Sequence, residues 1–282
     1  MTIESRMPRA EYDQIQAMSI TRLKGLRRSP LHYQYLLTNP KVTQPLTLGI
    51  GAHTAVLEPE RFLNDFAIWD RKTESGRAAP RNGKWWDAFQ LEHQGRTILT
   101  DEEARVSQAI AAAVRFDPVA NKYLASGDPE VTMRWELEEG RPAKGRIDWL
   151  TVIEGKPTIV GLKTTRDCRH FAFGSQAAKL DYAIQWAWYC DGYKKITGRE
   201  PQMVEIVVES EAPHAVATYF IRDDILLQGR DNYRELLKIL AECEAKDEWP
   251  GPQLCEEILT LPTWYYQDPN DDIDGLGLVA LA

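Results

Sequence analysis

Two short segments in the middle of the chain place an acidic and a basic side chain where they could act together on a phosphate. Residues 146–150 (RIDWL) and 159–165 (IVGLKTT) have the apolar character of buried strands, and the residues between them (154–157, EGKP) predict a short turn. Asp148 on the first strand would then face Lys163 on the second. A divalent metal held by a carboxylate, together with a lysine, can hydrolyse a phosphodiester. A structural ion pair explains the spacing equally well.

The elements expected around this pair are a central mixed sheet with helices on both faces, preceded by a helical N-terminal third. We expect one α/β domain over residues 1–282, with a mainly helical part (1–125), a sheet core that carries the site (126–246) and an extended tail (247–282). Expected strands span 130–137, 144–153, 157–163, 203–209 and 215–221. Expected helices begin at Ser19 and Ser29, and further ones span 47–57, 85–93, 101–116, 118–125, 181–196 and 223–245. Residues 39–45 and 70–84 are expected to be loops.

Composition limits the classes of function. The chain carries a net charge of −8 with a pI near 5.3, so a surface that binds nucleic acid must be local. No segment is long and apolar enough for a membrane span or a signal peptide, and we expect a cytoplasmic protein. The four cysteines are widely spaced, which argues against a disulfide framework, a zinc site or a cysteine-bound iron–sulfur cluster.

Other polar residues have a bland and a functional interpretation. His53 lies among small apolar residues of a helix, where a core histidine is more common than a ligand. Tyr182 and Gln185 share one helix face, and Thr164 and Thr165 end a strand, where binding to phosphate is possible but strand propensity suffices. Two basic clusters could contact DNA phosphates, and a solvated surface explains each of them equally well. They consist of Arg22, Lys24, Arg27 and Arg28, and of Arg71, Lys72, Arg77, Arg81 and Lys84.

Several segments, taken in order, resemble the RecE (exonuclease VIII) branch of the PD-(D/E)xK nuclease superfamily. The likeness runs from about residue 17 to 200, and its specificity comes from the joint order of the segments. They are residues 18–24, Ser29-Pro30, residues 48–62 with Leu48, Gly49, His53, Leu57, Glu58, Pro59 and Phe62, then Glu130, Trp135, residues 144–150, residues 162–165, and Tyr182, Gln185, Ala187 and Tyr189.

The resemblance implies a set of roles. His53, Asp148 and the backbone carbonyl of Leu162 would bind Mg²⁺, or Mn²⁺ in its place, with Glu130 beside the metal. Lys163 would be the catalytic lysine and Gln185 a helix glutamine near the site. The implied activity is ATP-independent 5′→3′ digestion of linear double-stranded DNA, in a homo-oligomeric ring (trimer or tetramer). The 3′-tailed product would pass to a RecT-type single-strand annealing protein in phage-type recombination.

Position 161 departs from this pattern, because the family has Asp or Glu there and this chain has Gly161. A site with one carboxylate should hold Mg²⁺ weakly, so we expect the activity of this chain to be impaired. Three explanations remain open: an inactivating substitution, a natural copy that binds DNA without cleaving it, or a substitute carboxylate such as Glu130 or Glu58. A scaffold or DNA-end-binding protein with the nuclease fold is therefore the alternative to a nuclease.

Overall fold

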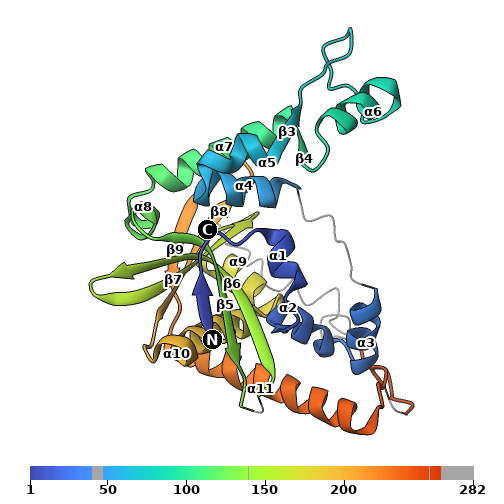
Figure 1. Ribbon diagram of the computed structural model, residues 1–282, viewed down its shortest axis with the longest axis vertical. Coiled ribbons are helices and arrows are strands. Elements are labelled where there is room, and N and C mark those ends of the chain that lie inside the picture. The colour runs from blue at the N-terminus through green and yellow to red at the C-terminus, as the bar shows by residue number, and fades with distance from the viewer. Residues whose placement is uncertain (40–46, 139, 254, 262–282) are drawn as a thin grey trace, which may run out of the picture.

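The protein is built around a mixed β-sheet (Figure 1). The computed structural model describes residues 1–39, 47–138, 140–253 and 255–261, and within these ranges seven strands form the main sheet. Six of them are hydrogen-bonded in the order β1-β5-β6-β7-β8-β9, and β2 pairs with β6. The strands are β1 (Thr2–Glu4), β2 (Met18–Ser19), β5 (Asp128–Glu136), β6 (Pro142–Ile153), β7 (Lys156–Thr165), β8 (Gln202–Glu209) and β9 (Val216–Phe220).

The centre of the sheet combines both strand directions. β5, β6 and β7 form an antiparallel meander, whereas β8 runs parallel to β7 and β9 antiparallel to β8. A parallel neighbour requires a crossover connection, and helices α9 (His170–Lys179) and α10 (Tyr182–Thr197) supply it. This crossover brings α10 onto one face of the sheet, beside the residues of interest on β7 and β8.

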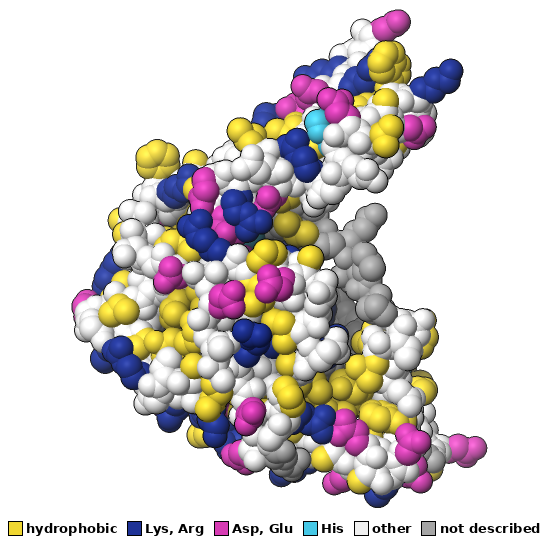
Figure 2. Space-filling model, viewed as in Figure 1, with side chains coloured by type: hydrophobic (Ala, Val, Ile, Leu, Met, Phe, Trp, Pro, Cys, Tyr) yellow, Lys and Arg dark blue, Asp and Glu magenta, His cyan; other side chains and the backbone are white. Residues whose placement is uncertain are grey.

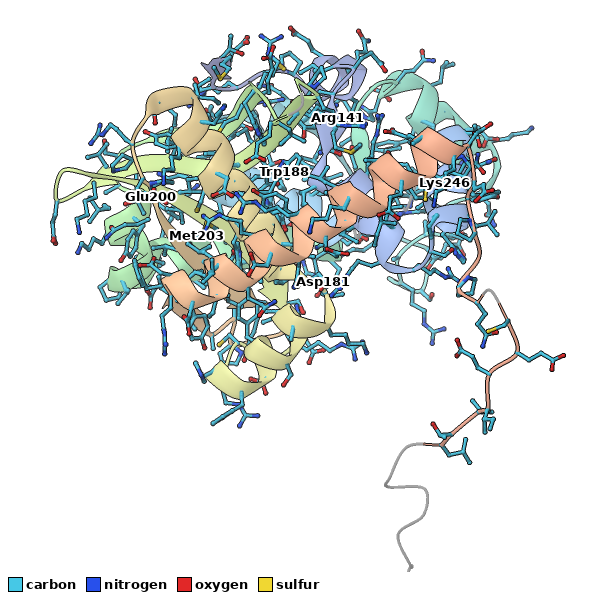
Figure 3. The ribbon with its side chains drawn as sticks, turned by 90° about the horizontal axis from the view of Figure 1, so that it is seen from below. Arg141, Asp181, Trp188, Glu200, Met203 and Lys246 are labelled. Carbon is cyan, nitrogen blue, oxygen red and sulfur yellow. The ribbon has the colours of Figure 1, made fainter. Side chains whose placement is uncertain are left out.

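Helices cover both faces of the sheet and form two hydrophobic cores. On one face α10, α11 (Asp223–Lys246), α2 (Ile20–Leu23) and α3 (Pro30–Thr38) pack around Ile147, Trp188 and Leu240. On the other face α4 (Thr47–Leu57), α7 (Asp101–Phe116) and α8 (Pro118–Leu124) pack around Leu162 and Ile206. Seen from below, α11 lies in front of α10 and packs against it (Figure 3). Alternate residues of β7 and β8 therefore enter different cores.

A smaller unit projects from the body as an arm (Figure 1). It consists of the parallel strands β3 (Phe66–Trp69) and β4 (Thr97–Thr100), the loop 70–82, and α6 (Gly83–Glu92). Trp69, Trp86, Phe89 and His93 form an aromatic cluster with ring centroids 4.3–6.4 Å apart, which gives the arm a small core of its own. Lys and Arg side chains share its surface with acidic ones (Figure 2).

The expected fold class, a central mixed sheet flanked by helices, is confirmed. Ser19 caps α2 as predicted and Ser29 caps α3, which begins at the predicted place; the two side chains accept hydrogen bonds from the backbone N–H groups of Arg22 and His32. The expected helix from Ser19 continues from α2 as a 3₁₀ turn, η1 (Lys24–Arg27). The sequence did not predict η2 (Pro59–Arg61), β1, β2, β3, β4, α1 (Arg9–Gln14), α5 (Phe62–Asp65) or α9. No helix within the described ranges is long and apolar enough to cross a membrane.

Two expected segments are covered only in part. The expected loop 39–45 lies outside the described residues apart from its first position, and the expected tail lies outside them from residue 262 onward. The described start of the tail packs on the body, since Trp249 stacks on Tyr33 with ring centroids 5.9 Å apart and Pro250 accepts a hydrogen bond from the backbone N–H of Leu31.

Candidate active site

The acidic residues of the candidate site lie in one row across four adjacent strands of the sheet. Gly161 on β7 is paired with Glu205 on β8. The pair Trp149–Val160 on β6 and β7 makes Asp148 the next residue opposite Gly161. On the other side of β6, the flanking pairs of the ladder place Glu130 of β5 beside Asp148. The row therefore runs Glu130, Asp148, Gly161, Glu205, with one glycine among three carboxylates.

Asp148 is oriented by the neighbouring strand. Its Oδ2 accepts a hydrogen bond of 2.8 Å from the backbone N–H of Leu162 and lies 3.7 Å from Lys163 Nζ. Burial alone would raise the pKa of Asp148, but the charges of Lys163 and His53 and the Leu162 N–H outweigh it and hold the pKa below its usual value. Asp148 is thus a carboxylate at neutral pH.

Lys163 joins two carboxylates. Its Nζ lies 3.7 Å from Asp148 Oδ2 and 3.4 Å from Glu205 Oε1, and it donates a hydrogen bond of 3.3 Å to the Leu162 carbonyl. Burial would lower the pKa of Lys163, but Glu205 and Asp148 raise it above its ordinary value. The side chain is therefore an ammonium at neutral pH, and it can act as a cation and hydrogen-bond donor but not as a general base.

Glu205 is the residue of the site that the sequence analysis missed. Its side chain is fully buried, and Oε2 accepts a hydrogen bond from the indole N–H of Trp186 on α10. Oε1 is buried and has no hydrogen bond, with Lys163 as its ion-pair partner. Burial raises the pKa of Glu205 against the opposing charge of Lys163. The available signal was a single Glu in the apolar run 203–208 (MVEIVV), because a buried carboxylate is costly unless it has a partner.

Gly161 makes room for this carboxylate. A Cβ atom at position 161 would lie 2.5 Å from Glu205 Oε2 and 2.7 Å from its Cδ. The space beside Gly161 is a cavity of about 10 Å³, close to the volume that one water molecule needs. It is lined by Asp148, Gly161, Lys163, Glu205 and apolar neighbours, together with Gln185, Trp186 and Tyr189 of α10. Gln185 lines this cavity, and its Nε2 donates a hydrogen bond of 2.9 Å to the Tyr189 hydroxyl.

His53 and Glu130 complete the surroundings of Asp148. His53, half-buried on α4, lies close to Asp148 and Glu130, and its charge is one of the contributions that lower the pKa of each carboxyl group. Glu130 has a left-handed backbone conformation (φ 50°) and forms an ion pair with Arg146. Burial and the charge of Asp148 raise the pKa of Glu130, against the effect of Arg146. Because of the ion pair with Arg146, the Glu130 carboxylate already has a partner within the protein.

The donor set fits a hard divalent cation, although no three His, Cys, Asp or Glu side chains converge on one point within the described parts of the chain. Mg²⁺ typically binds through one or two carboxylates and keeps waters or substrate phosphates as its other ligands. Asp148 and Glu205 border one cavity, and Glu205 Oε1 has no hydrogen bond. Lys163 supplies one ammonium beside these two acidic side chains.

The residues of the first basic cluster predicted to contact DNA differ in their surroundings. Arg22, Arg27 and Arg28 are exposed, and Lys24 is half-buried. Arg27 is held in an ion pair of 2.6 Å with Asp181 at the start of α10. Lys24 donates a hydrogen bond of 2.7 Å to the Leu180 carbonyl, and its Nζ lies 5.8 Å from the centre of the Tyr182 ring.

Lys24 and Tyr182 lie beside the site. Lys163 Nζ lies 5.7 Å from the centre of the same Tyr182 ring. Burial, opposed by Asp181 and assisted by Lys163 and Arg27, lowers the pKa of Lys24 to about 8.

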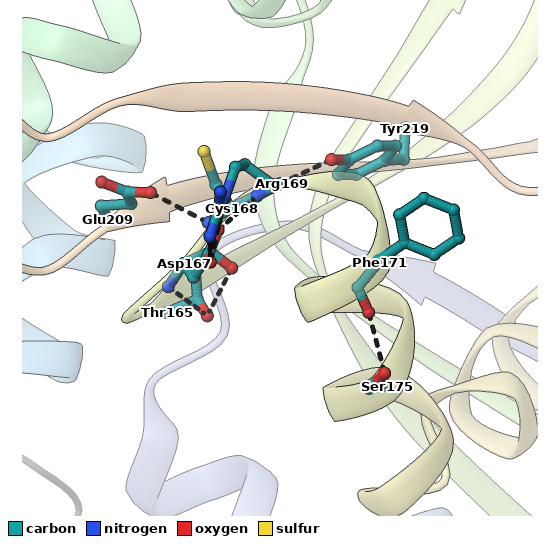
Figure 4. Close-up of polar contacts among 8 residues, drawn as sticks. All are labelled: Thr165, Asp167, Cys168, Arg169, Phe171, Ser175, Glu209 and Tyr219. Atoms are coloured by element: carbon teal, nitrogen blue, oxygen red, sulfur yellow. Dashed lines mark hydrogen bonds and ion pairs between the residues drawn. The ribbon is translucent and has the colours of Figure 1, made fainter. Parts of the chain in front are cut away.

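The two threonines at the end of β7 differ. Thr164 is half-buried, whereas Thr165 is buried and its hydroxyl donates a hydrogen bond of 2.8 Å to Gln176 Oε1. The same hydroxyl accepts a hydrogen bond from the backbone N–H of Asp167 (Figure 4). Glu209 of β8 fixes the same turn by accepting a hydrogen bond of 3.1 Å from the Cys168 N–H. The structure thus uses Thr165 to close the turn before α9 and not as a surface contact.

A carboxylate and a lysine on adjacent strands of a mixed sheet, with helices on both faces, define a PD-(D/E)xK-like protein. The chain belongs to the family described as a PDDEXK-like domain of unknown function (DUF3799), whose sequence model matches residues 19–261. None of the curated proteins compared with the chain matches it.

Solved structures include a similar fold. A candidate exonuclease from Eubacterium rectale is 17% identical, with 98% of this chain and all of that chain covered, at a TM-score of 0.59. Protein SSO0001 (16% identity, 39% and 50% covered, TM-score 0.26) and VC1899 from Vibrio cholerae (13%, 82% and 57%, TM-score 0.21) are too distant to support an argument. The first match supports the fold alone.

Proposed function

We propose that the protein is a RecE-type, metal-dependent DNA exonuclease. It would use Mg²⁺, or Mn²⁺, and no ATP to digest linear double-stranded DNA in the 5′→3′ direction and to leave 3′ single-stranded tails. The observation that carries the proposal is the meeting of Asp148 and Lys163 with the Gly161–Glu205 pair around one small cavity. The proposal is supported by the family match, because these residues lie within the segment 19–261 that matches the PDDEXK-like family.

Each residue of the site would have a separate role in the reaction. Asp148, the Leu162 carbonyl and His53 would hold the cation, which when bound activates water and polarises the phosphate. Lys163 is charged at neutral pH, so it would orient the attacking water and stabilise the negative charge on the phosphate. The bond between Gln185 and Tyr189 fixes a polar amide at the cavity. Lys24 and Tyr182 lie beside Lys163 and would contact the DNA backbone.

Partners follow from the resemblance. A homo-oligomeric ring (trimer or tetramer) would thread a duplex end, and a RecT-type annealing protein would receive the 3′ tail. A ring with basic residues inside and acidic residues outside would reconcile a net charge of −8 with binding to DNA.

The test compares linear and closed-circular duplex of one sequence, each with Mg²⁺ and with EDTA. We expect nucleotides to be released from the linear duplex alone and only with Mg²⁺, and a 5′-terminal label to be released before a 3′-terminal one. Lys163→Met should lower the rate by about 10²-fold or more, while Arg105→Ala, an exposed ion-pair residue on α7, should leave it unchanged. Release in EDTA, or equal digestion of both DNA forms, would contradict the proposal.

A second function has one observation in its favour. Lys163 already bridges Asp148 and Glu205, and no cluster of three metal-binding side chains forms within the described residues. A protein that binds DNA ends without cleaving them would show tight binding to linear duplex and no release of nucleotides at any Mg²⁺ or Mn²⁺ concentration.

A further inference from the structure

We infer that Glu205 is the second metal-binding carboxylate of the site, supplied by β8 in place of the acidic residue that β7 lacks at Gly161. This inference rests on the proposed function, because it assigns a ligand to the metal of that same site. It replaces the expectation that Gly161 leaves the site impaired.

The Glu205 carboxylate occupies the space that a side chain at position 161 would need. A side chain at position 161 would begin where the Glu205 carboxylate now lies, 2.5 Å from Oε2 and 2.7 Å from Cδ. Gly161 and Glu205 are directly paired across β7 and β8, so the Glu205 carboxylate reaches from the neighbouring strand into the space that the Cβ of residue 161 would fill. The Glu205 carboxylate in this position therefore excludes a side chain at position 161.

The surroundings prepare Glu205 to hold a cation. Trp186 fixes Oε2 through its indole N–H, which leaves Oε1 buried without a hydrogen bond at the cavity shared with Asp148. A structural counter-ion for Lys163 alone would not require a second carboxylate, because Asp148 already supplies one. The fully buried Glu205 and the half-buried Asp148 share the single ammonium of Lys163, and a divalent cation would offset the charge of a second carboxylate.

The other candidate carboxylates are engaged elsewhere. Glu58 is buried and accepts hydrogen bonds of 3.0 and 3.1 Å from the guanidinium of Arg61. Glu130 is paired with Arg146. Glu205 is the acidic residue that reaches the place left open by Gly161.

The experiment measures Mn²⁺ binding by calorimetry without DNA, together with thermal unfolding in EDTA. Glu205→Gln keeps the size of the side chain and an oxygen for Trp186, and removes the charge. Gly161→Asp adds the missing carboxylate without making room, and the double variant Gly161→Asp/Glu205→Ala moves the carboxylate back to β7. Glu58→Gln is the matched control, because it neutralises a buried, ion-paired glutamate away from the cavity.

We expect Glu205→Gln to weaken Mn²⁺ binding by at least about tenfold and Glu58→Gln to leave it unchanged. Gly161→Asp alone should lower the melting temperature in EDTA, and the double variant should bind Mn²⁺ close to the wild-type affinity. Three results would each overturn the inference: no Mn²⁺ binding by the wild type, unchanged binding by Glu205→Gln, or a double variant that binds no better than Glu205→Gln. If the exchange restores binding but no variant cleaves DNA, the proposed nuclease function fails and the assignment of Glu205 stands.

Discussion

Lys163 is the residue on which the charge balance of the site depends. Its ammonium lies 3.4–3.7 Å from Glu205 and Asp148, and its side chain is only 19% exposed. We expect Lys163→Met to lower the free energy of unfolding in EDTA by about 3 kcal/mol, because its loss leaves the buried Glu205 and the half-buried Asp148 without a cation. Urea unfolding at neutral pH measures the loss, and Mn²⁺ should recover part of it. Lys163→Arg, which keeps the positive charge, should lose less. Equal stability of Lys163→Met and wild type in EDTA would show that the carboxylates do not depend on Lys163.

Lys24 gives the site a dependence on pH. Burial and the neighbouring charges lower the pKa of Lys24 from 10.5 to about 8. The folded protein then binds fewer protons than the unfolded chain between these values, so this residue should make stability rise with pH from about 8 towards 10.5. DNA affinity should change in the opposite direction, because a cation is lost as pH rises through 8. Fluorescence anisotropy with duplex DNA from pH 7 to 9 measures this change. Lys24→Arg should remove the fall, and a wild-type affinity that is flat in this range would contradict the role of Lys24.

At the scale of elements, the position of α10 depends on its close crossing with α11. A Cβ atom at Gly229 of α11 would lie 2.5 Å from the carbonyl carbon of Ala183 on α10, and backbone cannot yield as a side chain can. We expect Gly229→Ala to destabilise the fold by about 1–3 kcal/mol, and to disturb Gln185 and Trp186 on the next turn. Gly174→Ala on α9 is the control, since nothing lies within 4 Å of its added Cβ, and it should stabilise by up to about 1 kcal/mol. Urea unfolding measures the stability of both variants. A Gly229→Ala variant that is more stable than the wild type would refute the close contact.

The arm is a second element for which the structure supports an expectation. Six basic and four acidic residues between Asp70 and Arg96 give it a net charge of +2, against −10 for the rest of the chain. Lys72 and Arg77 are exposed, whereas Arg81 is paired with Glu103 and Arg71 packs 3.9 Å from the centre of the Trp85 ring.

We expect the double variant Lys72→Ala/Arg77→Ala to bind duplex more weakly and to reduce the slope of log affinity against log salt by about 2, one unit for each lost phosphate contact. Arg105→Ala, on the exposed face of α7 beside Asp101, serves as the control and should not change the slope. A double variant with the wild-type slope would exclude the arm from DNA binding.

For the whole molecule, local sequence patterns predicted more than the pairing between distant segments. The strand around Asp148, the strand around Lys163 and the helix with Gln185 were predicted because periodicity and turn residues are local signals. Glu205 was not predicted as a site residue, because it joins the site only through the parallel pairing of β7 with β8, across a crossover that includes α9. The register that joins Gly161 to Glu205 cannot be derived from either strand alone, and α9 itself was missed because its sequence, HFAFGSQAAK, has a glycine in its interior and no strong cap.

The charge of the whole chain leads to a last expectation. A protein with a net charge of −8 can bind duplex only through local positive surfaces, so its affinity should depend strongly on salt. If about six phosphates are contacted, the affinity should fall by about 10³-fold between about 50 and 200 mM salt. If the chains form a ring that threads an end, linear duplex should also bind more tightly than a closed circle of the same sequence. Anisotropy titrations on both DNA forms at several salt concentrations measure the two effects together. An affinity independent of salt would rule out phosphate contacts as its source, and equal affinity for the two forms would rule out threading.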